Sequence, residues 1–140
     1  MGGANKQIVI SELPKEQLEE RHFSTTEAEI PEPGDGEVLA RTLLLSLDAA
    51  NRAWMQGATY TDPLMAGEIM NGGGLSEVVT SDADEFAPGD IIECQSGWQE
   101  YSVHSSKAIS KIAPGRPMSQ YLSILGITGL TAYFGLLEVG

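Results

Sequence analysis

Short apolar segments between proline–glycine turns occupy much of residues 31–103, and this pattern restricts the chain to a β-rich fold. The run Pro-Glu-Pro-Gly-Asp-Gly at 31–36 predicts a turn, because proline fixes φ and glycine admits positive φ. Residues 37–47 then combine period-two alternation with a run of leucines, which is typical of a strand buried on at least one face. The dipeptide Pro88-Gly89 fits a type II turn. Short strands at this spacing predict a small barrel or sandwich.

The rest of the first 117 residues divides into further strands and one polar connection. Residues 13–23 are polar and predict an exposed loop or a single helical turn. The other segments with a strand pattern are 5–10, 75–80, 91–94 and 98–103.

Helical spacing replaces the strand pattern after Pro117. Ser119 is the expected N-cap, and Gly126 and Gly129 are expected to break the segment into two helices. We therefore divide the chain into residues 1–117 and a helical segment, 118–140. The apolar stripe of that segment consists of Leu122, Leu125, Leu130, Tyr133, Phe134 and Leu137.

Composition excludes several classes of function. The chain has 140 residues, enough for one domain with a sizeable core, and a formal net charge of −12. So acidic a chain does not suit nucleic acid, whose phosphates favour a basic surface. No apolar run approaches the roughly 18 residues of a membrane span. The single cysteine, Cys94, allows no internal disulfide and fits a cytoplasmic protein.

Three stretches, in this order, carry a resemblance to a known family: "IPEPGDGEVLARTLLLSLDAANRAWM", "FAPGDIIECQSGWQEYSV" and "LGITGLTAYFGLLEVG". Together they resemble the N-terminal, GroES-like domain of zinc-independent medium-chain dehydrogenases/reductases, in the branch of the prostaglandin and alkenal double-bond reductases. The resemblance covers roughly residues 6–140. It implies a mainly β fold, a partly open barrel with short helices, and a C-terminal helix that leads toward a Rossmann domain outside this sequence.

The resemblance also implies an activity, the NADPH-dependent reduction of the C=C bond of α,β-unsaturated ketones or aldehydes. Hydride would add to the β-carbon, and the developing enolate would need hydrogen-bond donors and a proton at the α-carbon. In the family a tyrosine outside these residues usually assists, so the catalytic residue stays unassigned. NADPH would bind mainly to the missing domain, so the 140-residue chain is expected to be inactive alone. The parent protein is expected to be a cytoplasmic homodimer.

Two other functions remain open. A quinone oxidoreductase of the same superfamily would use the same cofactor but deliver electrons to a flat aromatic acceptor. A stand-alone, non-enzymatic GroES-like binding module is the alternative from a different class, since fold does not decide function. Such a module would cover its apolar stripe, for example by dimerising through Leu130, Phe134 and Leu137.

Zinc is not expected. Cys94, His22 and His104 are far apart in sequence and lack the spacing of zinc ligands. Where zinc-dependent relatives have Gly-His-Glu, this sequence is aligned as Gly67-Glu68 without a histidine. Ile127 stands where those relatives place a cysteine.

The resemblance points to three residues that would contact the cofactor. Asn51 follows the "LSLD" segment, and its amide suits the nicotinamide ribose or the substrate oxygen, although it could equally cap a turn or helix. Some relatives have "DPYMR" here, so Ala50 stands where they have a tyrosine. Thr131 resembles a threonine that approaches the nicotinamide, with Thr128 as a weaker candidate. The alternative for Thr131 is a bond to its own helix backbone.

Four residues are expected to line an apolar substrate pocket, with Trp54 and Met55 packed beside them. These four are Tyr60, Met70, Trp98 and Gln99. Each has a structural alternative, such as a core position for a tryptophan. The "NGGG" run before residue 75 is interpreted as a turn rather than a phosphate cradle, because it precedes a strand instead of opening a helix. Cys94 is expected to be buried and inert.

Overall fold

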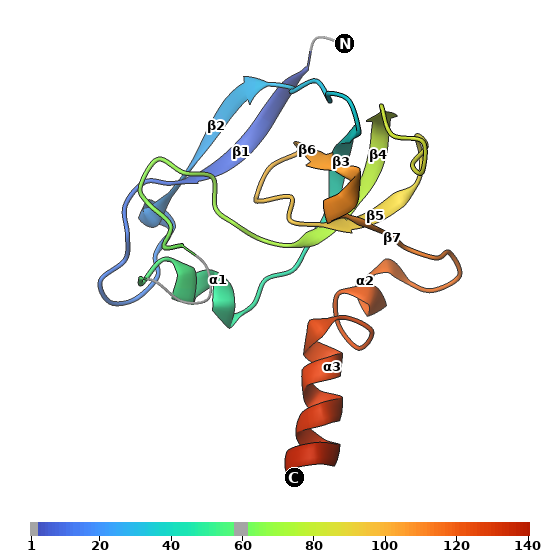
Figure 1. Cartoon of the computed structure of the whole chain (residues 1–140). Helices are drawn as coiled ribbons and strands as arrows, with labels where there is room; N and C mark the ends of the chain where they lie inside the picture. The colour runs from blue at the N-terminus through green and yellow to red at the C-terminus, as the bar shows by residue number, and fades with distance from the viewer. Residues whose placement is uncertain (1–2, 58–61) are drawn as a thin grey trace.

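The structure is a computed structural model and describes residues 3–57 and 62–140. It is mainly β, with one sheet of two strands in the order β1-β2 and one of five strands in the order β6-β3-β4-β5-β7 (Figure 1). In the described part of the chain the sheets do not close into a full barrel, and the predicted partly open arrangement is confirmed. The strands are β1 (Ala4–Ile10), β2 (Phe23–Glu29), β3 (Glu37–Leu45), β4 (Gly74–Ser81), β5 (Ile91–Cys94), β6 (Tyr101–Ser105) and β7 (Ser110–Lys111).

The strand β3 lies second in the order of the larger sheet, where it pairs antiparallel with β4 and β6. Register shifts between Leu39 and Ala40, and again between Thr42 and Leu44, interrupt its pairing with β4. Irregularities of this kind bend a strand and increase its twist. The core beneath this sheet consists of Val38, Ala40, Val78, Ile92 and Cys94.

The strand β2 was not predicted. It pairs with β1 along its whole length, from Phe23 opposite Ile10 to Glu29 opposite Ala4. All its residues after Phe23 are exposed, so it has no apolar alternation to detect. Before it, Glu20–His22 forms one 3₁₀ turn, as expected of residues 13–23.

The predicted strand at 98–103 begins later, at Tyr101. Its first residues instead join the two sheets: Ile8 N donates to Trp98 O (2.8 Å), and Glu100 N donates to Lys6 O (3.0 Å). An isolated bridge links Gln7 to Gln99. The larger sheet is thereby fastened to β1.

The turn predicted at Pro88-Gly89 is confirmed. Asp90 N donates to Ala87 O (3.0 Å), and Gly89 has a φ of +91°, which type II turns require at their third residue. Asp90 also accepts from Ala87 N (2.8 Å) and pairs with Lys111 at 2.6 Å. Lys111 and this backbone bond hold the pKa of Asp90 below its usual value.

The α-helices among the described residues are α1 (Ala49–Trp54), α2 (Met118–Tyr121) and α3 (Ile127–Phe134), the last continuing through residues 135–139, and Ser106–Ala108 forms a 3₁₀ turn. Two predicted details of the last segment need correction. Pro117, not Ser119, is the N-cap of α2, and Ser119 lies inside its first turn. Gly129 does not break the segment, because it lies within α3. The break predicted at Gly126 is confirmed, since Gly126 is the N-cap of α3.

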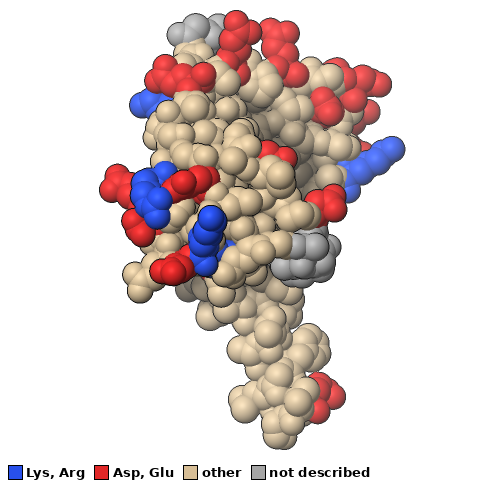
Figure 2. Space-filling view, turned by 90° about the vertical axis from the view of Figure 1, so that its left-hand side faces the viewer, with Lys and Arg blue, Asp and Glu red and all other residues tan. Residues whose placement is uncertain are grey.

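The helix α3 projects away from the strands (Figure 1). No residue from 118 to 140 is buried, and Leu130, Phe134 and Leu137 are 50%, 53% and 60% exposed. Figure 2 shows acidic side chains spread over the body, while the projecting segment is almost free of charge. Within the described residues, the helices are too short or too polar to span a bilayer.

Cys94 is expected to resist thiol reagents until the protein unfolds. Its side chain is 5% exposed, and burial raises the pKa of its thiol, with a bond to Ser76 Oγ (3.4 Å) acting in the opposite direction. Because the thiolate is the reactive form, a raised pKa slows reaction at neutral pH. Titration with a thiol reagent should give no fast reaction without denaturant and one equivalent with it. A fast native reaction would contradict this environment.

Candidate functional site

The helix α1 follows the end of β3 because residues 48–51 form a capping box. Asp48 accepts from Ala50 N (2.7 Å), and Asp48 N donates to Asn51 Oδ1 (2.8 Å). Both bonds satisfy groups at the start of the helix that have no partner within it. Sequence analysis did not predict this helix, although Asp-x-x-Asn is a recognisable variant of the cap.

Asn51 is 8% exposed, and its amide is largely used within the protein. Besides accepting from Asp48, it donates from Nδ2 to Asn71 O (3.1 Å). The geometry therefore matches the helix-capping alternative, with one Nδ2 hydrogen left for another acceptor. Contact between Asn51 and a cofactor stays a prediction.

Met70 lies in the second hydrophobic core rather than on an open surface. Its side chain is 1% exposed and packs in one cluster with Ile10, Trp54 and Met55. Ala50 packs against this cluster, so the position of the missing tyrosine borders the core that contains Met70. Trp54 and Met55 lie beside Met70, as predicted.

Trp98 covers the same cluster from the segment between β5 and β6. Its ring stacks on Phe23 with centroids 5.5 Å apart and an angle of 24° between the planes. The indole Nε1 is buried and has no hydrogen-bond partner in the described part of the chain. A Cβ added at Gly72 would lie 2.8 Å from that nitrogen and 3.5 Å from Asn51 Nδ2. Gly72 therefore lies close to both Trp98 and Asn51, two of the residues predicted for the site.

The side chain of Gln99 is fixed at the junction of the sheets. Its Oε1 accepts from Asn5 Nδ2 (3.2 Å) and Gln7 Nε2 (3.0 Å), and its Nε2 donates to Ser96 O (2.9 Å). These bonds explain why the segment before β6 follows β1.

The structure therefore places Asn51 and Trp98 beside Gly72, and Met70 in the cluster against which Trp98 packs. Gln99 follows Trp98 directly in the chain. Trp98 N donates to Met70 O (2.8 Å), which connects two of them directly. Tyr60 lies outside the described residues. The two threonines predicted for the cofactor, Thr128 and Thr131, are exposed on α3, which lies apart from α1 in Figure 1.

Thr131 makes the internal bond that was considered as its alternative: Oγ1 donates to Ile127 O (2.7 Å). The lone pairs of this hydroxyl can still accept a hydrogen bond. A role for Thr131 at the nicotinamide stays a prediction.

Two neighbouring residues, Asn71 and Gly72, were missed by sequence analysis. The glycine run precedes a strand as predicted, since β4 begins at Gly74, but residues 71–73 form no turn. Its close approach to Trp98 depends on tertiary packing. In the sequence, only the glycine run at 72–74, close to Met70, could have drawn attention to Asn71 and Gly72.

The residues considered and rejected as zinc ligands, His22, Cys94 and His104, each make a separate contact. His22 is 2% exposed, and its Nδ1 lies 2.8 Å from Glu19 N, whereas His104 Nε2 lies 2.7 Å from Ser102 Oγ. Burial lowers the pKa of His104. Across residues 3–57 and 62–140, His, Cys, Asp and Glu side chains nowhere form a group of three that could hold a metal ion.

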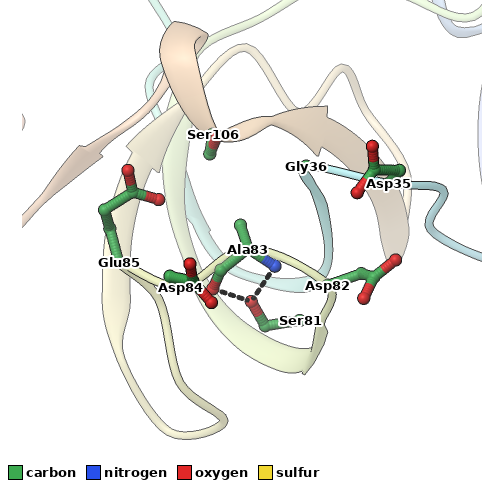
Figure 3. A pocket seen from close by; sticks show the side chains of 8 residues that line it. All are labelled: Asp35, Gly36, Ser81, Asp82, Ala83, Asp84, Glu85 and Ser106. Atoms are coloured by element: carbon green, nitrogen blue, oxygen red, sulfur yellow. Dashed lines mark hydrogen bonds between the residues drawn. The ribbon is translucent and has the colours of Figure 1, made fainter.

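A hollow of about 470 Å³ lies at the far end of β3 from α1 (Figure 3). Ser81 Oγ donates to Ala83 O (2.9 Å) and accepts from Ala83 N (3.1 Å), so it is satisfied within its own loop. The carboxylates around the hollow do not form a metal-binding group among the described residues. The lining residues are Asp35, Gly36, Ser81, Asp82, Ala83, Asp84, Glu85 and Ser106.

Comparison with known proteins identifies close relatives. YfmJ of Bacillus subtilis (strain 168) is 40% identical over 142 residues, covering 100% of this chain and 42% of the relative. The NADPH-dependent curcumin reductase of Escherichia coli (strain K12) is 37% identical over 139 residues, covering 97% and 40%. The NADP(+)-dependent 2-alkenal reductase of Nicotiana tabacum is 33% identical over 144 residues, covering 97% and 42%. The chain therefore spans about two fifths of the length of these relatives.

A solved structure shows the same fold. The crystal structure of CurA in complex with NADPH from Vibrio vulnificus superposes with a TM-score of 0.87 at 33% identity, covering 95% of this chain and 40% of that chain. The expected GroES-like fold is thus confirmed. A family described as the N-terminal domain of oxidoreductase matches residues 6–112. The chain belongs to the medium-chain dehydrogenase/reductase family of oxidoreductases, and residues 6–112 are its N-terminal domain.

Proposed function

We propose that the protein is an NADPH-dependent oxidoreductase that reduces the C=C bond of α,β-unsaturated ketones or aldehydes. The observation that carries this proposal is the similarity of nearly the whole chain to two reductases, one named for curcumin and one for 2-alkenals. Curcumin is a conjugated enone, and a 2-alkenal is the corresponding aldehyde. The substrate class that these two relatives share, and that we propose for this protein, is the α,β-unsaturated carbonyl compounds.

The residues around α1 suit an apolar, conjugated substrate. Trp98 and the Met70 cluster behind it supply an apolar wall, and Asn51 adds a polar group at its edge. Such a combination, mostly apolar with few polar groups, is common in small-molecule sites. NADPH, when bound, would supply the hydride. Thr128 and Thr131, with their exposed positions on α3, are the residues of this chain proposed to face its nicotinamide.

The phosphates of NADPH are proposed to bind elsewhere in the complete protein. Within the described residues no strand leads through a glycine-rich turn into a helix, the unit that cradles a pyrophosphate. The relatives are more than twice as long as this chain, which leaves room for a nucleotide-binding domain. We propose that this domain covers the exposed stripe of α3. Residues 1–117 would then be the catalytic domain and 118–140 the start of the connection.

Three further properties belong to the same proposal. The reaction is proposed to need no zinc, since the protein's histidines and its cysteine are committed to separate structural contacts. The protein is proposed to be cytoplasmic, as its one buried cysteine suits. A homodimer is proposed on family resemblance alone.

Cofactor binding by the complete protein and by residues 1–140 alone tests whether NADPH binds mainly outside this chain. The complete protein is expected to bind NADPH with micromolar or tighter affinity, while residues 1–140 alone should bind no tighter than about 1 mM. The reason is that the short chain lacks a pyrophosphate cradle. Isothermal titration of both proteins measures the difference. Micromolar binding by residues 1–140 would contradict the proposed division.

Substrate profiling of the complete protein separates the enone reductase from the quinone oxidoreductase. NADPH oxidation should be faster with an enal such as 2-nonenal than with a simple quinone, at equal concentration. A reversed preference would favour the quinone oxidoreductase. Absence of turnover with either acceptor, together with absence of NADPH binding, would favour the non-enzymatic module.

A further inference from the structure

The loop from Met70 to Gly73 lies against Asn51 and Trp98 of the candidate site, and most of it is fixed by backbone bonds. Met70 O accepts from Trp98 N (2.8 Å), Gly72 O from Gly97 N (3.0 Å) and Gly73 O from Ser46 N (2.9 Å). These bonds tie the loop to the segment before β6 and to the end of β3. Two separate segments of the chain therefore fix the position of the loop.

Asn71 is the exception, because its carbonyl is held by a side chain. Asn51 Nδ2 donates to Asn71 O (3.1 Å) while Asn51 Oδ1 accepts from Asp48 N (2.8 Å). One amide therefore joins the start of α1 to the loop. With 8% of its surface exposed, this amide bridges two backbone groups in a region largely shielded from water, where losing a partner is costly.

Gly72, the next residue, transmits the position of the loop to Trp98. A Cβ at Gly72 would lie 2.8 Å from Trp98 Nε1 and 3.0 Å from Cδ1, so the indole edge leaves no room for a side chain at this position. The indole also stacks on Phe23, with centroids 5.5 Å apart. The Trp98 indole thus lies between the Phe23 ring and the loop from Met70 to Gly73. A displacement of this loop would therefore move the indole.

We propose that Asn51 is a positioning residue for substrate: it holds Asn71 and Gly72 against Trp98 and thereby sets the apolar wall that receives the conjugated part of an enone or enal. Its effect is on substrate affinity, exerted through the loop, and its amide does not need to touch the cofactor. This inference rests on the proposed reductase function. It assigns Asn51 a role different from the cofactor contact expected from family resemblance.

Asn51→Asp in the complete protein tests the proposal, because the substitution keeps the shape and the acceptor for Asp48 N but removes the donor. A carboxylate oxygen then faces Asn71 O. The KM for 2-nonenal should rise about tenfold, while kcat and the KM for NADPH change less than about twofold. A rise confined to the KM for NADPH would overturn the proposal, as it would show direct contact with the cofactor.

Ser81→Ala is the matched control at the opposite end of β4. It also removes side chain–backbone bonds, those to Ala83 at 2.9 and 3.1 Å, but far from the loop. Its kinetic constants should equal those of the unchanged protein. If it raised the KM for 2-nonenal as much as Asn51→Asp does, the effect would be general destabilisation and the proposal would fail.

Amide hydrogen exchange provides a readout that does not depend on activity. In Asn51→Asp the amides of Ser46, Gly97 and Trp98 should exchange faster, since their acceptors lie on the loop. In Ser81→Ala they should keep their protection. If the complete protein reduces no enal, the proposed function fails, but exchange still decides whether Asn51 positions the loop. Unchanged exchange in Asn51→Asp would overturn the proposal.

Gly72→Ala is the second variant, in case Asn51→Asp does not fold. It displaces the loop from the other side by placing a methyl group against Trp98. The same selective rise in the KM for 2-nonenal is expected. A folded Gly72→Ala protein with unchanged KM would show that the loop position does not control substrate affinity, which overturns the proposal.

Discussion

Gly74→Ala is expected to lower the free energy of unfolding by about 3 kcal/mol, at the upper end of the usual cost of overpacking. A Cβ at this position would lie 2.2 Å from Leu44 O, a distance that no side-chain adjustment can relieve because the atom belongs to the backbone. Gly74 is the first residue of β4 and lies opposite Leu45 and Cys94, the last residues of β3 and β5. The clash therefore falls on a strand that is paired on both sides. Urea unfolding followed by circular dichroism measures the loss.

Gly73→Ala is the control for this variant. Its added Cβ would meet Gln95 Nε2 at 3.1 Å, the end of an exposed side chain that can move away. The expected cost is below about 1 kcal/mol. Equal losses from Gly73→Ala and Gly74→Ala would contradict the close approach of β3 and β4 at this point.

Met70→Ala is expected to lower the free energy of unfolding by about 2–5 kcal/mol, the range for truncating a buried methionine. Met70 is 1% exposed and is surrounded by Ile10, Trp54 and Met55, so alanine would leave a cavity in the core behind Trp98. The KM of the complete protein for 2-nonenal should rise as well, because that wall loses support. Denaturant unfolding and steady-state kinetics measure the two effects.

Met70→Leu is the matched variant, since leucine has a similar volume. It should cost less than about 1.5 kcal/mol and leave the KM for 2-nonenal nearly unchanged. A large rise in KM with wild-type stability in Met70→Ala would instead identify Met70 as a direct substrate contact, as first predicted from the sequence, and would contradict its assignment to the core.

Most of the larger sheet could be predicted from the sequence because its strands alternate or run apolar between turn residues. The strand at 91–94 and the turn at Pro88-Gly89 were predicted with the bounds and type observed. The strand β2 could not be found this way, since its polar residues form a sheet only through pairing with β1. Propensity gives little information when tertiary pairing decides the structure.

The candidate site was only partly predictable. Residue types and family resemblance pointed to Asn51, Met70 and Trp98, and the structure brings these three together. Some of their partners are distant in the sequence, as Asn71 is from Asn51, 20 residues away, so sequence spacing does not indicate these contacts. The burial of Met70 could not be predicted either, because a methionine in a pocket and a methionine in a core look the same in the sequence.

Identification of the reaction product tests the central proposal most directly. The complete protein would be incubated with NADPH and 2-nonenal, and the product identified by mass spectrometry and NMR. The account predicts nonanal, in which the C=C bond is reduced and the aldehyde is kept, with one NADPH consumed per molecule. Formation of the allylic alcohol 2-nonen-1-ol would contradict the account, because hydride would then have been delivered to the carbonyl carbon.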